Sequence, residues 1–265
     1  SMPAHADTCG ENVSFRGLEE ILLRCATSIA LTAFSAACTE HHCVACHDPG
    51  PDKLGAEFYK EFEDLVAGDL LSMLKEAIKV GYFHEDARTG EIILLYKKND
   101  PREIRNYRPI TLLNVDYKIT GKILVQRMKD VMDRIVSSPQ LGFVPGRVIT
   151  EATHYLKLMQ AIADEEDLDG IVVAADWEKA FDRVSWEYLR GALGELGFGD
   201  MMRGWIGAMY NDDAPPIRRV RANGVRSEPF SIHSGVPQGC PTSPLIFLLV
   251  AEALTRLVLD DEHLQ

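Results

Sequence analysis

Apolar residues in the first half of the chain recur with the periods of helices and strands. Helical spacing over 58–78 predicts a helical segment that should stop at Gly81. An apolar run over 91–96 predicts a strand, and 109–113 predicts its partner strand. The spacing over 119–135 predicts a long amphipathic helix. The pattern therefore indicates a chain of mixed helices and strands.

The second half contains one uninterrupted apolar run, at 171–175, and it leads directly into Asp176. Such a run is typical of a strand that is buried on both faces. A carboxylate at the tip of a buried strand is costly unless it lies at a cleft or binds a metal. The remaining pattern predicts helices at 186–196, 202–209 and 244–259 and short strands at 217–220 and 230–232. Ser243 is the expected N-cap of the last helix, with Pro244 in its first turn.

The composition changes near Pro49, and residues 1–49 lack a sustained amphipathic pattern. We expect this segment to pack poorly against the rest and to be dispensable. It holds five of the six cysteines, and Cys43-Val44-Ala45-Cys46-His47 matches the pattern of c-type haem attachment. Together with Cys38, His41 and His42, these residues could instead bind zinc, or the cysteines could be incidental.

The 265 residues carry a formal net charge of −12, which argues against binding a polyanion. The charge is uneven, because 88–134 contains eleven Lys/Arg and six Asp/Glu, a balance of 11 − 6 = +5. No apolar run reaches the roughly 18–20 residues of a membrane span. Acidic residues precede the apolar stretch at 26–37, where a signal peptide carries positive charge. We therefore expect an intracellular protein of the nucleus or cytoplasm that is not secreted.

Two long motifs suggest a family. Around Asp176 the chain reads AADWEKAFDRVSWEYL, and around Gly235 it reads SGVPQGCPTSPLIFLLVAEAL. They resemble motifs A and B of the reverse transcriptases of LINE-type (non-LTR) retrotransposons. The resemblance begins with GPDKL at Gly50 and continues through KKNDPREIRNYRPITLLNVDYKITGKIL and QLGFVPGR. It thus covers most of the chain, in segments that keep the order they have in that family.

The resemblance implies an α/β (α+β) fold, the right-hand polymerase core. Residues 50–170 would form the fingers and their connection to the palm, and 171–265 an incomplete palm without a thumb. The family's motif C, an aromatic-x-Asp-Asp hairpin, should follow motif B, and we do not find it there. Tyr210-Asn211-Asp212-Asp213 spells this motif, but it precedes motif B. Two prolines follow it and could not form the second strand of a hairpin, so we reject it.

By this resemblance the chain is part of an RNA-directed DNA polymerase that uses an RNA template, a DNA primer, deoxynucleoside triphosphates and two Mg²⁺ ions. Two metal ions clamp the attacking and leaving oxygens in such a reaction, and Mg²⁺ prefers oxygen ligands. Asp176 would bridge both ions, and the backbone carbonyl of Trp177 would complete one coordination shell. Because no other carboxylate is placed with them, we expect the chain alone not to polymerise.

The resemblance also assigns the nucleotide contacts. Ala180 and Phe181 are expected to contact the nucleotide, and the ring of Phe181 would lie under the incoming sugar and exclude a 2′-hydroxyl group. Gln238 and Gly239 would contact the base and template. The cations expected to hold the triphosphate are Lys97, Lys98 and Arg108, and Arg147 is expected on the template or primer backbone.

Two alternatives stay open. The chain could be a catalytically dead remnant that binds nucleic acid or nothing. It could also be an RNA-templated RNA polymerase, since Asp176 and Asp182 have the D-x5-D spacing of such enzymes. Motif B here lacks the Thr and Asn with which those enzymes recognise a ribose.

Overall fold

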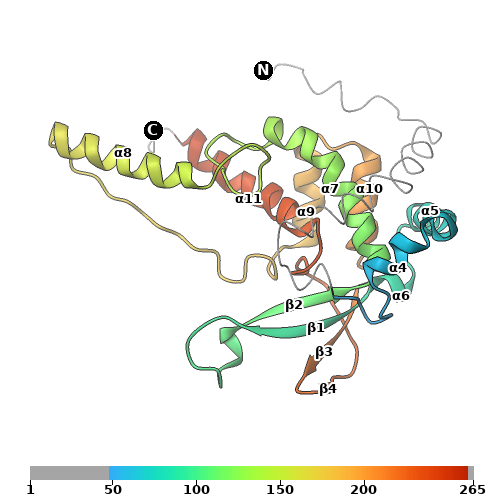
Figure 1. Cartoon of the computed structure of the whole chain (residues 1–265). Coiled ribbons are helices and arrows are strands. Elements are labelled where there is room, and N and C mark those ends of the chain that lie inside the picture. The colour runs from blue at the N-terminus through green and yellow to red at the C-terminus, as the bar shows by residue number, and fades with distance from the viewer. Residues whose placement is uncertain (1–47, 262–265) are drawn as a thin grey trace.

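The computed structural model describes residues 48–261, which form one mixed sheet with helices beside it (Figure 1). The cysteine and histidine predictions for 38–47, and nearly all of the predicted segment 1–49, lie outside the described residues. Within the described part of the chain, no helix is long and apolar enough to span a membrane.

The sheet is built around β1 (Thr89–Tyr96). β2 (Tyr107–Leu113) pairs with β1 in antiparallel register after the short 3-10 turn η2 (Ile104–Asn106), and β3 (Ile217–Ala222) pairs with the other edge of β1 in parallel. Two short strands, β4 (Val225–Arg226) and β5 (Phe230–Ser231), pair with β3. All four predicted strands of this sheet are thereby confirmed. The sheet joins strands that are more than 100 residues apart in sequence, and the candidate site lies beside it.

The observed helices confirm most of the helices that the spacing of apolar residues predicted. They are α4 (Ala56–Glu61), α5 (Glu63–Val80), α6 (Glu85–Arg88), α7 (Val115–Ile135), α8 (Thr150–Glu166), α9 (Trp186–Glu195), α10 (Asp200–Met209) and α11 (Ser243–Asp260). The first predicted helical segment is two helices that meet at Phe62, and it ends at Gly81, whose φ of +85° favours glycine. Apolar faces of α7, α9, α10 and α11 form the core, for example at Met128, Leu189 and Leu249.

One strand prediction was wrong. Residues 171–175 form no strand, and their side chains face water, with Ile171 91% and Val173 83% exposed. The physical reason is the lack of a partner, because no strand among residues 48–261 pairs with this segment. An apolar run forms a buried strand only where a neighbouring strand can form hydrogen bonds with its backbone.

Two further features differ from the sequence analysis. The 17-residue helix α8 was not predicted, although Tyr155, Met159 and Ile162 have helical spacing. None of its residues is buried, and Figure 1 shows it extending away from the other helices. The N-cap of α11 is Thr242, not Ser243, whose hydroxyl instead donates to the carbonyl of Pro237.

The segment after Asp48 is held against the start of α7 by polar contacts. The amide of Asp52 donates to Asn114 Oδ1 at 3.3 Å, and Lys118 Nζ donates to the carbonyl of Asp48 at 2.8 Å. In the first turn of α7, the pKa of Asp116 is raised to about 6. Burial is the largest cause, the bond from the Tyr117 amide opposes it, and the nearby charges of Asp52 and Asp86 add to it. An ionised Asp116 therefore destabilises this junction.

We predict that Asp116→Asn stabilises the protein at pH 7.5 by about 2 kcal/mol and leaves its stability unchanged at pH 4. The folded-state pKa is higher than the unfolded value. The stability contribution of the protonated carboxyl is therefore complete below pH 4 and is lost as the pH rises through about 6. Urea unfolding across this range measures the effect, with Asp130→Asn, at an exposed position of the same helix, as the control. Equal changes in the free energy of unfolding of both variants would contradict the prediction.

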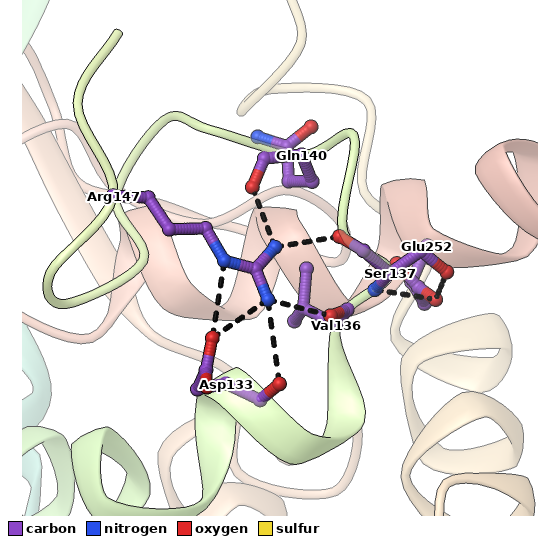
Figure 2. Close-up of polar contacts among 6 residues, drawn as sticks. All are labelled: Asp133, Val136, Ser137, Gln140, Arg147 and Glu252. Atoms are coloured by element: carbon purple, nitrogen blue, oxygen red, sulfur yellow. Dashed lines mark hydrogen bonds and ion pairs between the residues drawn. The ribbon is translucent and has the colours of Figure 1, made fainter. Parts of the chain in front are cut away.

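Arg147 caps the C-terminal end of α7 (Figure 2). Its Nη1 donates to the carbonyls of Ser137 and Gln140 at 2.6 and 2.8 Å. Its Nη2 donates to the carbonyl of Val136 at 3.0 Å and to Asp133 Oδ1 at 2.8 Å. Carbonyls at a helix end lack partners within the helix, and here one guanidinium satisfies several. Arg147 thereby fixes the loop that follows α7.

Glu252 holds the same turn from the opposite side. Its side chain in α11 is only 1% exposed and accepts from the amide and hydroxyl of Ser137 and from Arg256 Nε. Figure 2 shows Glu252 and Arg147 on either side of Ser137. The end of α7 is therefore joined both to the loop after it and to the helix of motif B.

We expect Arg147→Gln to lower the free energy of unfolding by roughly 2–4 kcal/mol, because it leaves several carbonyls of this turn without a donor. Arg102→Gln is the matched control, since that side chain is 89% exposed and, among residues 48–261, forms an ion pair only with Asp100. Chemical denaturation of both variants measures the difference. A loss for Arg147→Gln no larger than that of the control would show that the network is not stabilising.

Candidate functional site

The turn after Asp176 and the loop of motif B are joined by backbone hydrogen bonds. The amide of Gly235 donates to the carbonyl of Val184 at 2.7 Å, and the amide of Val236 donates to the carbonyl of Phe181 at 2.8 Å. Trp186 Nε1 adds a bond to the carbonyl of Gly235 at 2.8 Å. Segments about 50 residues apart in sequence thus form one rigid junction.

Gly235 makes this junction possible. Its φ is +83°, and a Cβ at this position would lie 2.7 Å from the carbonyl oxygen of Asp182. Any other residue would therefore combine a strained backbone with a clash against main-chain atoms, which cannot move as a flexible side chain can. The glycine of motif B is required for contact with motif A.

Aromatic side chains also connect the two motifs. The rings of Phe181 and Phe247 lie 5.4 Å apart between centroids, and the ring of Trp177 meets Phe247 edge-on at 6.0 Å. Phe181 and its neighbour Ala180 are half-buried, whereas Asp176 is exposed at the end of the unpaired segment 171–175. The structure thus brings two of the predicted motif A residues, Trp177 and Phe181, against the helix of motif B.

The loop of motif B also contacts the sheet. The amide of Thr111 in β2 donates to the carbonyl of Gln238 at 2.7 Å, and the adjacent Gly239 has a φ of +132° that favours glycine. Arg108, three residues before Thr111 on the same strand, is exposed. Gln238 and Gly239 therefore lie beside the strand that carries Arg108.

The predicted triphosphate cations lie at one end of the β1–β2 hairpin. Lys97 and Lys98 are exposed in the connection just after β1, and Arg108 pairs in register with Leu95 close to the same end. Arg102 and Arg105 in the connection are also exposed. The hairpin therefore presents positive charge from a chain that is acidic overall, as the distribution of Lys and Arg indicated.

Arg147 does not join these residues in the structure. Its side chain is 14% exposed, and its guanidinium is bonded to the end of α7. A phosphate contact would have to replace these bonds, so its predicted role on template or primer gains no support from the geometry.

The rejected Asp-Asp pair is confirmed not to form a hairpin. Tyr210 is the C-cap of α10, and Asn211 Oδ1 accepts from the amides of Asp213 and Ala214 in a tight turn. Asp212 pairs with Arg190 at 2.8 Å. These side chains stabilise a helix-to-strand connection.

The sequence analysis missed Phe247 and Arg218. Phe247 has the spacing of an ordinary apolar helix position, and only the fold shows that it packs against both rings of motif A. Arg218 belongs to an Arg-rich strand that resembles an exposed surface, yet it is 3% exposed. Strand alternation, which places it on the face of Val220, is the signal that could have identified it.

The described residues do not assemble a complete metal site. In the range 48–261, no group of three His, Cys, Asp or Glu side chains is arranged to hold a metal ion. Asp176 is exposed and could supply one carboxylate ligand. Asp182, on the same turn, has a pKa raised by burial, an effect that Lys179 partly opposes.

Comparison with known proteins places these motifs in a family. The family described as reverse transcriptase (RNA-dependent DNA polymerase) matches residues 96–264. The "Transposon TX1 uncharacterized 149 kDa protein" of Xenopus laevis is 35% identical over 79% of this chain and 16% of its own length. The "Probable RNA-directed DNA polymerase from transposon BS" of Drosophila melanogaster is 31% identical over 67% of this chain and 20% of its own length.

A third relative, the "RNA-directed DNA polymerase from mobile element jockey" of Drosophila funebris, is 26% identical over 75% of this chain and 22% of its own length. The chain therefore spans about a fifth of the length of these curated relatives. The family match over more than half of the chain, together with these relatives, shows that the chain belongs to the reverse transcriptase (RNA-dependent DNA polymerase) family, of the type carried by LINE-type (non-LTR) retrotransposons.

Proposed function

We propose that this chain carries the nucleotide-binding part of an RNA-directed DNA polymerase, which transfers nucleotides to the 3′-hydroxyl of a DNA primer on an RNA template. The observation that carries the proposal is the junction of three segments. The turn after Asp176 bonds to the loop of motif B, and that loop bonds to the strand of Arg108. The side chains proposed to contact the sugar and the phosphates thus come from one connected framework, and Asp176 lies just before its first segment.

Asp176 is the proposed metal ligand, with the carbonyl of Trp177 as a second oxygen donor. Exposure leaves the carboxylate accessible to a hard cation, which prefers such ligands. Members of this family use divalent metal ions, and we propose two Mg²⁺ ions, which would supply charge stabilisation to the transferred phosphoryl group.

The other roles follow from position. Lys97, Lys98 and Arg108 are exposed at one end of the hairpin, and we assign them to the triphosphate. Gln238 and Gly239 would contact the base pair between nucleotide and template. Phe181 is held by its backbone bond to Val236 and by the ring of Phe247, so it can act as a fixed steric limit under the sugar.

We also propose that the chain taken alone does not polymerise. Asp176 follows a segment that no strand supports within the described residues, and the carboxylate would not be held in place. Catalysis depends on fixed ligands, and losing this stabilisation costs orders of magnitude in rate.

The test is primer extension on an RNA template with Mg²⁺. It compares the chain alone with a chimera in which the following segment of the Xenopus TX1 relative is appended. We expect synthesis only by the chimera, and Asp176→Asn should lower its rate by at least about a thousandfold. Glu178→Gln is the control, because the only ion pair of this exposed neighbour within the described part of the chain is with Arg183. Activity of the chimera that survives Asp176→Asn would refute the proposed metal ligand.

Sugar selection provides a second test. In the active chimera, we expect Phe181→Val to admit ribonucleotides, because the smaller side chain leaves room for a 2′-hydroxyl group. Competing incorporation of deoxy- and ribonucleotides measures the preference, with Phe230→Val at an exposed position as the control. A change in preference within about twofold, under about 0.5 kcal/mol, would show that the ring has no steric role.

A further inference from the structure

A cavity of about 370 Å³ lies between the sheet and the loop of motif B. Ile92 and Thr111 line it from β1 and β2, Arg218 lines it from β3, and Asp182 and Trp186 line it from the motif A segment. Its volume falls within the roughly 300–1,000 Å³ of ligand pockets. Because Gln238 also contributes to the wall, the cavity adjoins the proposed nucleotide site without using its cations.

Arg218 is the most unusual residue of this cavity. It is 3% exposed, and its Nη1 donates to the carbonyls of Arg88 and Ile217 at 2.7 and 2.8 Å. Among residues 48–261, its Nε and Nη2 have no hydrogen-bond partner, and no carboxylate pairs with it. By contrast, Arg221 and Arg226 share Glu91. A buried guanidinium that no carboxylate neutralises is costly, so a ligand that offers acceptors to the two remaining donor atoms of Arg218 would be stabilised.

The rest of the lining narrows the chemistry of that ligand. Trp186 and the rings of Pro109 and Pro237 provide flat apolar walls of the kind on which nucleobases pack. Asp182 adds a carboxylate acceptor. The cavity thus combines apolar walls, two donor atoms of one guanidinium and a carboxylate acceptor, beside the polar side chains of Ser231, His233 and Ser234.

Guanine fits this combination better than the other bases. It presents two neighbouring acceptors, O6 and N7, which arginine recognises with two parallel hydrogen bonds. Its adjacent edge carries N–H donors that a carboxylate can accept. Adenine places an amino group where guanine has O6, and that donor would face the guanidinium. Pyrimidines lack N7.

We propose that this cavity binds a single unpaired guanine base, with Arg218 donating to O6 and N7 and Asp182 accepting from the Watson–Crick edge. The base could come from the RNA strand or from a free guanine nucleotide. The RNA source rests on the proposed function, because the template would pass Gln238 at the cavity wall. Recognition of the base itself requires neither metal nor catalysis.

The test measures equilibrium binding of the whole chain to short single-stranded RNAs in buffer with EDTA. One oligomer contains only adenines, a second carries one central guanine, and a third carries 7-deazaguanine at that place. Free GMP and AMP form a parallel arm, measured by calorimetry. We expect the guanine oligomer to bind about tenfold more tightly than the adenine oligomer, and 7-deazaguanine to lose most of this preference.

Variants locate the site. Arg218→Lys, which cannot donate two parallel bonds, and Ile92→Phe, which fills the cavity, should both abolish the guanine preference. Arg219→Gln changes an exposed neighbour on the same strand and should weaken all RNAs alike while keeping the preference. Circular dichroism checks folding. If Arg218→Lys does not fold, Ile92→Phe and the 7-deazaguanine oligomer still decide the question.

The outcomes separate this proposal from the proposed function. RNA binding without a guanine preference would overturn the cavity assignment and leave the polymerase proposal intact. Arg218-dependent binding of GMP with no binding of RNA would support the cavity and count against an RNA template. Equal affinity for guanine and adenine in both arms would refute the proposal.

Discussion

The contact between Gly235 and the turn of motif A is the constraint on which the candidate site depends. Two carbonyls of that turn accept amide protons from the loop of motif B, and the approach leaves no room for a Cβ. The position of Phe181 follows, because its own carbonyl is one of these acceptors. The loop in turn reaches β2 through Gln238, so the sheet and motif A are oriented by one short segment.

A second set of contacts fixes the motif B loop through the helix that follows it. The motif B loop runs directly into α11, and Glu252 of that helix binds the turn at the end of α7. Arg147 caps the same turn, so α7, the loop after it and α11 share one polar network. The rigidity of the site therefore derives partly from residues that would touch no substrate, a common requirement where reacting groups must be held in a fixed geometry.

Positive charge is unevenly distributed over the molecule, although its net charge is negative. Exposed cations gather at the hairpin of β1 and β2, where a polyanion would be attracted locally. Arg218 lies in the same sheet but is almost fully buried, and it lines the adjoining cavity. Arg218 and Arg219 are adjacent in sequence, yet Arg218 is buried and Arg219 is exposed. Their environments therefore differ although their positions in the sequence do not.

Elements whose stability is local could be predicted from the amino-acid pattern alone. The helix α7 and the strands β1 and β2 follow from spacing, because one apolar face or run is enough to define them. The motifs also indicated the family, and the comparisons confirm it.

Features that depend on partners distant in the chain could not be predicted in this way and become visible only in the folded molecule. The apolar run at 171–175 predicted a buried strand, but a strand also needs a neighbour to bond its backbone, and none lies beside it within 48–261. Arg147 was expected on nucleic acid and instead bonds to the end of a helix, because the fold brings carbonyls of α7 within its reach. Burial of Arg218 likewise arises from packing between β3 and the motif B loop, which spacing along one strand cannot reveal.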